Sequence, residues 1–277
     1  MNHARVDVPN VLSIAGSDPS GGAGIQADLK TFAALGCYGM AVITALTAQN
    51  TQRVFGVHLP PSDFVAAEID AIFDDVDVHA VKIGMLGSGE IARAVADRVR
   101  RQSAPSAVLD PVLVATSGDA LGTPDLVDVL RDELLPLAML ITPNLPEAAR
   151  LADRPAPTNV EGMQHLAERL HALGARAVLV KGGHLTGAEA TDVFFDGKSH
   201  RQFTSPRVET GGETHGTGCT LASAIAAYLA RGFALADAIE AAKKYVTQAL
   251  QASGKLRVGQ GAAPVDHLYA LRPRLDE

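Results

Sequence analysis

The sequence predicts a single α/β domain whose central sheet is mostly parallel and is covered by helices on both faces. Short runs that are apolar throughout alternate along the chain with longer amphipathic segments, and strands buried under helices on both faces read in this way. The chain has 277 residues, a length that one α/β core can occupy. It shows no internal repeat and no clear linker, so we expect one domain over 1–277 with its core at about 11–268.

The elements of this domain follow in order from the change in periodicity. Six apolar runs are expected to be strands, at 11–15, 40–46, 79–84, 106–110, 139–142 and 177–182. The amphipathic segments between them are expected to be helices, at 24–35, 62–74, 89–102, 124–134 and 159–173. Residues 191–204 should form a hairpin around Asp196-Gly197, because this dipeptide favours a two-residue turn. Two helices, at about 217–230 and 234–252, should follow, and then a polar tail.

The composition is typical of a cytoplasmic globular protein. Hydrophobic residues make up 47% of the chain and charged residues 20%, and no long apolar run is present, so we expect no contact with a membrane. A formal net charge of −7 and the absence of Trp argue against nucleic acid as a partner. The N-terminus does not resemble a secretory signal. Of the two cysteines, Cys37 is expected in the core.

Polar and glycine-rich segments follow each of the six predicted strands: GSDPSGGAG, TAQNT, GML, DPV, TPNLPE and KGGH. Ligands of parallel sheets bind outside the carboxyl ends of the strands. Any one of these segments could be ordinary turn chemistry. All six together predict a binding site at this edge of the sheet.

A glycine turn, THGTGC at 214–219, leads into a helix of small residues. The first amides of a helix lack intrahelical partners, and the helix dipole adds partial positive charge. Gly216, Thr217 and Gly218 are therefore predicted to hold an anion. Cys219 follows directly, where the anion would bind.

Two other segments partly match known nucleotide-binding motifs. The GKS at 197–199 is not a P-loop, because Asp192 stands where that motif needs glycine. The segment from Gly22 to Ala27 matches the loose dinucleotide pattern G-x-G-x-x-A, which leaves an NAD-binding oxidoreductase as a distant alternative. Against it, six residues separate the strand from Gly22, and no acidic residue follows the second strand.

Seven segments resemble one known family in order and spacing: AGSDPSGGAGIQADLKTF, VITALTAQNT, KIGML, ITPNLPEA, KGGH, THGTGCTLASAIAA and VGQGAAPVDH. The family is that of the bacterial hydroxymethylpyrimidine/phosphomethylpyrimidine kinases, in the ribokinase-like superfamily. The resemblance implies a ribokinase-like fold, use of ATP and Mg²⁺, and a homodimer. It also implies two successive phosphoryl transfers in thiamine biosynthesis, first to 4-amino-5-hydroxymethyl-2-methylpyrimidine and then to its monophosphate. A pyridoxal-type vitamin kinase on the same fold is the alternative.

The resemblance also assigns roles to individual residues. The pyrimidine is expected among Gly16, Asp28, Gln49, Met85 and Val112. The carboxamide of Gln49 offers both an acceptor and a donor, which suits a ring nitrogen beside an exocyclic amine. Without the family, Asp28 would equally be a solvated charge near the start of a helix.

On the nucleotide side, Asn144 and Lys181 are expected to contact the phosphates, and Asp110 or Glu147 to hold Mg²⁺. Glu147 could instead be an acidic residue in the first turn of a helix that begins near Pro146. His184 and His215 are expected only as polar lining.

Cys219 would be the general base, with the amides of Gly216, Thr217 and Gly218 around the transferring phosphoryl group. A helix N-terminus lowers the pKa of a thiol from about 8.5, and we expect this at Cys219. The alternative for Cys219 is simple packing at a crowded helix start.

Overall fold

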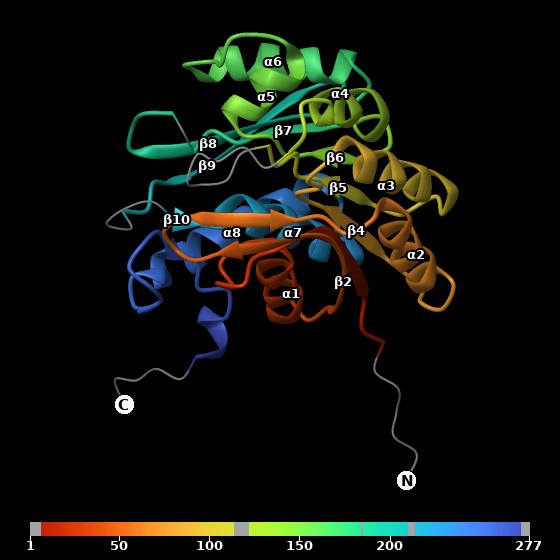
Figure 1. The fold of residues 1–277 in the computed structure, drawn as a ribbon. Coiled ribbons are helices and arrows are strands. Elements are labelled where there is room, and N and C mark those ends of the chain that lie inside the picture. The colour runs from red at the N-terminus through yellow and green to blue at the C-terminus, as the bar shows by residue number, and fades with distance from the viewer. Residues whose placement is uncertain (1–6, 114–121, 184, 210–213, 273–277) are drawn as a thin grey trace.

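The fold is a nine-stranded sheet in a computed structural model that describes residues 7–113, 122–183, 185–209 and 214–272 (Figure 1). The strands lie in the order β3-β2-β1-β4-β5-β6-β7-β8-β9. Their bounds are β1 Asn10–Ser17, β2 Tyr38–Gln49, β3 Val54–His58, β4 Ala80–Ile83, β5 Ala107–Leu109, β6 Leu140–Ile141, β7 Val178–Val180, β8 Glu189–Phe195 and β9 His200–Pro206.

The sheet is mostly parallel, as the sequence predicts. The six central strands pair in parallel, in the sheet order β2, β1, β4, β5, β6 and β7. Strands β3, β8 and β9, at the two edges, pair antiparallel. Strand β1 pairs with β2 on one side and with β4 on the other. The chain order reverses there, and the loops after β1 and β4 diverge and leave a crevice for a ligand.

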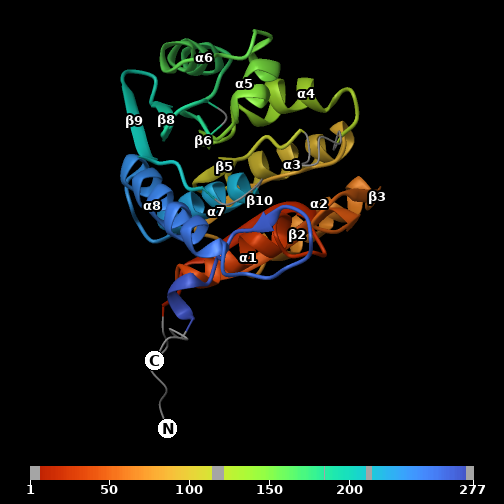
Figure 2. The ribbon, with the colours of Figure 1, turned by 90° about the vertical axis from the view of Figure 1, so that its left-hand side faces the viewer.

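Helices cover both faces of the sheet (Figures 1 and 2). Successive residues of β1 point to opposite faces of the sheet. Val11 packs in the hydrophobic cluster with α1, α7 and α8, and Leu12 packs in the cluster with α2, α3, α5 and α6. The bounds are α1 Gly24–Ala34, α2 Ser62–Phe73, α3 Gly89–Arg101, α5 Leu145–Ala152, α6 Val160–Ala172, α7 Thr217–Ala230 and α8 Leu235–Ser253. A short helix α4, Leu126–Val129, continues as a π-helical turn over Leu130–Leu134. Among the described residues, no helix is both long and apolar enough to cross a membrane.

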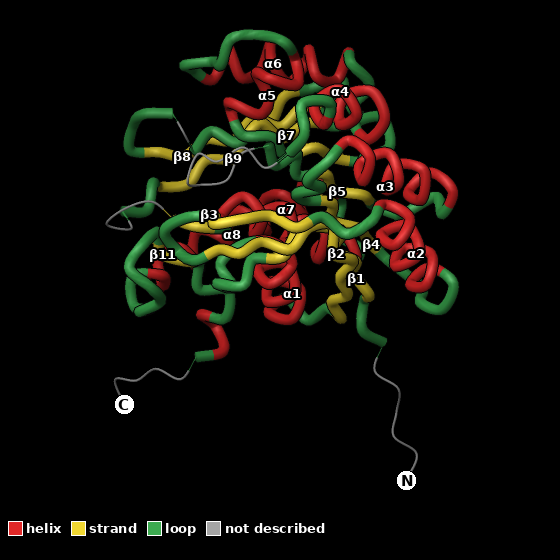
Figure 3. The backbone as a smooth tube through the Cα atoms, viewed as in Figure 1, coloured by secondary structure: helices red, strands yellow, loops and turns green. Residues whose placement is uncertain are grey.

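Three short elements depart from the sequence-based expectations (Figure 3). Strand β3 was not among the expected elements, and helix α5 was expected only as the alternative for Glu147, a helix that begins near Pro146. The segment after α8 was expected to be a polar tail, and this is wrong: β11 (Ala263–Pro264) pairs in parallel with β10 (Thr214–His215). Residues Val265, Asp266 and His267, which follow β11, are buried. The C-terminal segment therefore packs against the glycine turn that begins α7.

Candidate active site

A cavity of 1290 Å³ opens at the carboxyl ends of the parallel strands. A pocket for one small ligand typically measures about 300–1,000 Å³, so this cavity has room for a nucleotide and a second small molecule. All the site residues predicted from the sequence line it except Asp28: Gly16, Gln49, Met85, Asp110, Val112, Asn144, Glu147, Lys181, Gly216, Thr217, Gly218 and Cys219. The six loops thus converge on one site, as the strand order predicts.

Asp28 lies beneath the cavity rather than in its lining. Its side chain is fully buried and pairs with the equally buried ammonium of Lys82 at 2.8 Å. The hydroxyls of Ser13 and Ser223 also donate to its carboxylate, at 2.6 and 2.5 Å. The structure therefore does not bring Asp28 into the predicted substrate site. The alternative, a solvated charge near a helix start, is also wrong because water cannot reach the carboxylate.

Lys82 is a site residue that the sequence analysis missed. It borders the cavity, and its side chain is fully buried. Burial favours the neutral amine, but the carboxylate of Asp28, together with Cys219 and Asp110, outweighs this and raises the pKa of Lys82 above its usual value. A lysine inside the apolar run HAVKIG could have indicated this role, because a lysine is rarely buried without a charged partner. Its partner is 54 positions away, which no local pattern reveals.

The glycine turn before α7 is packed tightly against the loop that follows β1. Gly216 caps α7 with a φ of +83°, and a Cβ atom at this position would lie 1.8 Å from the carbonyl oxygen of Gly22. Only glycine therefore fits. Thr217 and Gly218, in the first turn of α7, border the cavity, where the unpaired amides of a helix start can hold an anion.

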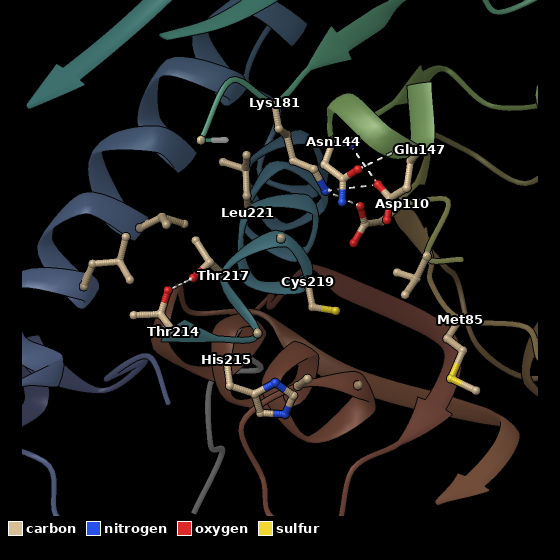
Figure 4. Close-up of a pocket in the computed structure, with 18 of the residues that line it drawn as sticks. Met85, Asp110, Asn144, Glu147, Lys181, Thr214, His215, Thr217, Cys219 and Leu221 are labelled. Atoms are coloured by element: carbon tan, nitrogen blue, oxygen red, sulfur yellow. Dashed lines mark hydrogen bonds and ion pairs between the residues drawn. The ribbon is translucent and has the colours of Figure 1, made fainter. Parts of the chain in front are cut away.

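Cys219 is a partly exposed free cysteine in that first turn, and Figure 4 shows its sulfur directed into the cavity. Burial raises the pKa of this thiol to about 11, although the ammonium of Lys82 acts in the opposite direction. The carboxylates of Asp110 and Asp28 add to the rise. The expectation of a lowered pKa is therefore wrong: desolvation and two nearby negative charges outweigh the helix start and the lysine.

Lys181, Asp110 and Glu147 gather at one side of the cavity (Figure 4). Lys181 follows β7, and its ammonium lies 2.7 Å from Asp110 and 4.0 Å from Glu147. Burial raises the pKa of Glu147 to about 7, with Lys181 opposing the rise and Asp110 adding to it. Two carboxylates thus share one ammonium, which leaves excess negative charge at this end of the cavity.

Asn144 and Glu147 also form a capping box at the start of α5. The Asn144 side chain accepts a hydrogen bond from the Glu147 amide at 2.9 Å, and the Glu147 carboxylate accepts from the Asn144 amide at 2.8 Å. The alternative for Glu147, a residue of a helix first turn, is therefore confirmed. It does not remove Glu147 from the site, since the residue also lines the cavity.

Gln49, Met85 and Gly16 line another part of the cavity. The Gly16 amide donates to the Met85 carbonyl at 3.0 Å, and a Cβ atom at Gly16 would lie 3.1 Å from the Met85 sulfur. Val112 packs against the small apolar cluster of Met85 and Ala45. This side offers apolar surface together with the carboxamide of Gln49, as the heterocycle prediction requires.

Asp18 and His215 connect the loop after β1 with the glycine turn. Their side chains lie 2.8 Å apart, and both border the cavity. Asp18 was not among the site residues predicted from the sequence, although its place in GSDPSGG is typical of an Asp that binds nearby backbone amides. His215 lines the cavity as expected, whereas His184 lies outside the described residues.

The arrangement fits Mg²⁺ by its donor chemistry. This ion keeps several waters and takes one or two carboxylates from a protein, and Asp110 and Glu147 are two buried carboxylates on one side of the cavity. Within the described part of the chain, no cluster of three or more His, Cys, Asp or Glu residues could form a complete protein cage.

Comparison with known proteins identifies close relatives over almost the whole chain. A family model described as phosphomethylpyrimidine kinase matches residues 18–266. The chain is 55% identical over 258 residues to a hydroxymethylpyrimidine/phosphomethylpyrimidine kinase of Rhizobium meliloti, with 93% of this chain and 96% of that protein covered. It is 50% identical over 261 residues to a bifunctional thiamine biosynthesis protein of Geobacter sulfurreducens, with 94% and 52% covered. A solved ADP complex of Bacillus subtilis pyridoxal kinase has a TM-score of 0.87 and 36% identity, with 96% and 99% covered.

Proposed function

The chain belongs to the phosphomethylpyrimidine kinase family, and from this premise we propose how its cavity carries out two phosphoryl transfers. The enzyme is a kinase of thiamine biosynthesis on a ribokinase-like fold. It phosphorylates 4-amino-5-hydroxymethyl-2-methylpyrimidine and then the resulting monophosphate, with ATP as donor. The observation that carries this function is the family match over 18–266, combined with the convergence of the six polar loops on one cavity.

The pyrimidine lies on the side of Gln49, Met85, Val112 and Gly16. The Gln49 carboxamide pairs with the edge formed by a ring nitrogen and the exocyclic amine, and Met85 and Val112 cover the ring faces. The hydroxymethyl group then points toward Cys219, which borders the same cavity. ATP occupies the other side, with Lys181 and Asn144 at its phosphates.

In the first transfer, the hydroxyl oxygen attacks the γ-phosphorus of ATP, the bond to the bridging oxygen breaks, and ADP leaves. The hydroxyl proton passes to the sulfur of Cys219. The thiolate is a minor species at neutral pH because burial raises its pKa to about 11, but it is a strong base once formed. The amides of Gly216, Thr217 and Gly218 stabilise the charge on the transferring group.

Asp110 and Glu147 would hold Mg²⁺, directly or through water. The ion supplies charge neutralisation at the phosphates. Lys181, beside these two carboxylates, holds phosphate oxygens as a point charge. Burial acts to lower its pKa, but the charges of Asp110 and Glu147 raise it.

A second candidate is phosphorylation of pyridoxal, favoured by the similarity to the Bacillus subtilis pyridoxal kinase. A coupled assay of ADP release separates the candidates, with the pyrimidine alcohol, its monophosphate, pyridoxal and ribose as substrates. We expect turnover of both pyrimidines in the presence of Mg²⁺. Turnover of ribose or pyridoxal without pyrimidine turnover would contradict the proposal.

We propose that the active enzyme is a homodimer located in the cytoplasm, where free cysteines such as Cys37 and Cys219 persist. Strand β3 is the last strand at one edge of the sheet. Near it, Leu46, Phe55 and Val57 are 46%, 57% and 45% exposed, and exposed apolar residues on an edge strand favour association. Sedimentation velocity should show a dimer that Phe55→Lys converts to monomer. A monomeric wild type would contradict this assembly.

A further inference from the structure

The carboxylate of Asp18 is surrounded by hydrogen-bond donors. Its Oδ1 atom accepts from the Ser20 amide and hydroxyl at 2.9 and 2.7 Å, and its Oδ2 atom accepts from the amides of Gly22 and Ala23 at 3.1 and 2.9 Å. Burial acts to raise the pKa of Asp18, but the hydrogen bonds from His215, Ser20 and Ala23 hold it well below the usual range. Asp18 is therefore an acceptor only.

This fixes the proton on the facing ring nitrogen of His215. The His215 Nε2 atom lies 2.8 Å from Asp18 Oδ2, and a carboxylate without a proton cannot donate. The Nε2 atom must therefore carry a hydrogen, whether the ring is neutral or charged. The same nitrogen lies 3.2 Å from one terminal atom of the Gln49 carboxamide. A protonated Nε2 atom cannot accept from the Gln49 nitrogen, but it can share its hydrogen between Asp18 and a Gln49 oxygen placed there.

The other terminal atom of Gln49 faces a hydroxyl whose proton is already in use. Thr47 Oγ1 is in donor position to two acceptors, the Ser17 carbonyl at 2.9 Å and the Gln49 Oε1 atom at 3.2 Å. Its single hydrogen can serve only one of them fully, and the Ser17 carbonyl is nearer, so Thr47 presents mainly lone pairs to Gln49. Gln49 thus lies between a donor on the His215 side and an acceptor on the Thr47 side.

The two neighbours demand the same orientation of the carboxamide. With its nitrogen at His215 and its oxygen at Thr47, Gln49 would oppose donor to donor and acceptor to acceptor. A rotation of 180° about the Cγ–Cδ bond converts both contacts into hydrogen bonds, because the carboxamide has one acceptor end and one donor end.

We propose that Asp18 and His215 are positioning residues that hold the Gln49 oxygen toward His215, and that they thereby determine which heterocycle edge the cavity accepts. The inference rests on the proposed contact between Gln49 and the pyrimidine. The Gln49 oxygen accepts from the exocyclic 4-amino group, and the second hydrogen of its NH₂ group donates to the adjacent ring nitrogen. The amine of the substrate therefore lies on the His215 side.

The test compares the 4-amino substrate with its 4-oxo analogue, which presents a ring N–H and a carbonyl and so reverses the donor and acceptor pattern. Binding of each alcohol is measured by calorimetry without ATP. The wild type should bind the amine about 10²-fold more tightly, because a mismatched edge leaves buried polar groups unpaired. In His215→Phe, which keeps a ring but removes the N–H, the carboxamide can rotate, and the preference should fall below about tenfold.

Ser20→Ala is the matched control. It removes one donor to Asp18 and leaves the contact between Asp18 and His215, so the ratio of the two affinities should stay at its wild-type value. A merely structural role of His215 would weaken both ligands equally and leave the ratio unchanged, which would overturn the inference. If His215→Phe fails to fold, Asp18→Asn decides: it nearly keeps the size of the side chain but removes the charge that holds the proton on His215 Nε2, so the ratio should fall. An unchanged ratio there overturns the inference as well. Failure of the wild type to bind either pyrimidine would instead contradict the proposed function.

Discussion

The ammonium of Lys82 lies 2.8 Å from the carboxylate of Asp28, and both side chains are fully buried. The two groups belong to β4 and α1, and Ser13, which pairs with Lys82 across β1 and β4, donates to the same carboxylate. Lys82 borders the cavity and Asp28 lies behind it. The pair therefore places a fixed ammonium group at the base of the active site. Its counter-ion, the Asp28 carboxylate, is held by hydrogen bonds from buried hydroxyls.

Lys82→Met should lower the free energy of unfolding by about 3–5 kcal/mol, because it leaves the Asp28 charge buried without its partner. Adding Asp28→Asn should restore part of the loss, since the remaining side chain is neutral. Urea unfolding of both variants measures this. Arg101→Met is the control: it breaks the ion pair with Asp97, whose members are 66% and 37% exposed, and should cost about 1 kcal/mol or less. Equal losses in Lys82→Met and the double variant would show that the isolated charge is not the cause.

Gly216→Ala should abolish both phosphoryl transfers. The new Cβ would lie 1.8 Å from the Gly22 carbonyl oxygen, so the glycine turn and the loop after β1 must separate. Gly232→Ala is a matched control, because Gly232 has a similar φ of +87° with nothing within 4 Å of the added Cβ. It should cost about 1 kcal/mol of stability and retain activity. Steady-state assays of both steps compare them, and full activity in Gly216→Ala would contradict the tight packing of the two loops.

The sequence predicted the parallel strands because strands buried on both faces are apolar at every position, which leaves a strong local signal. Strand β3 carried no such signal, since four of its five residues are exposed. Strand β11 is two residues long and pairs with β10, about 50 positions away in the chain. Such short pairings depend on tertiary contacts that periodicity does not record.

The residues of the candidate site also fall into two groups, those that a local sequence pattern predicts and those that depend on contacts between distant segments. Residues at or just after the carboxyl ends of strands, such as Gln49 and Lys181, could be predicted because these ends converge in a parallel sheet. The contacts of Asp28 with Lys82, and of Asp18 with His215, join segments 54 and 197 positions apart. The pKa of Cys219 was predicted in the wrong direction because the helix start was visible in the sequence, whereas the surrounding desolvation was not.

Mg²⁺ binding should weaken as pH falls through 7. Burial raises the pKa of Glu147 to about 7, so below this pH the carboxyl group carries a proton that must leave before the ion binds. By linkage, the affinity should approach a tenfold loss per pH unit below about 7 and be constant well above it. Calorimetric titration of Mg²⁺ into the enzyme with ADP measures the effect. The pH should run from about 5.5 to about 8.5, so that it covers values below and above this pKa. Glu147→Gln, which can preserve the capping box, should bind more weakly and show only the pH dependence that comes from the ADP phosphate itself, whose pKa is about 6. A wild-type pH dependence equal to that of Glu147→Gln would exclude Glu147 from the metal site.

The role of Cys219 can be separated from helix packing because the two transfers have different nucleophiles. In the first, a neutral hydroxyl must lose its proton. In the second, the nucleophile is a phosphate oxygen that is already ionised near neutral pH, since the second pKa of a phosphomonoester is about 6. Cys219→Ala should therefore slow the first transfer by about 10²–10⁴-fold and the second much less, with ATP affinity almost unchanged because the amides of Gly216 to Gly218 remain.

The pH dependence gives an independent test of the same base. Burial raises the pKa of Cys219 to about 11, so the thiolate fraction grows about tenfold per pH unit throughout the neutral and mildly alkaline range. The kcat/KM of the first transfer should rise with this slope between about pH 7 and pH 9, because kcat/KM reports the ionisation of the free enzyme. The second transfer should be nearly flat there, and the slope of the first should disappear in Cys219→Ala. Equal losses in both transfers, together with a slope that survives the substitution, would assign Cys219 to positioning the substrate rather than to removing its proton.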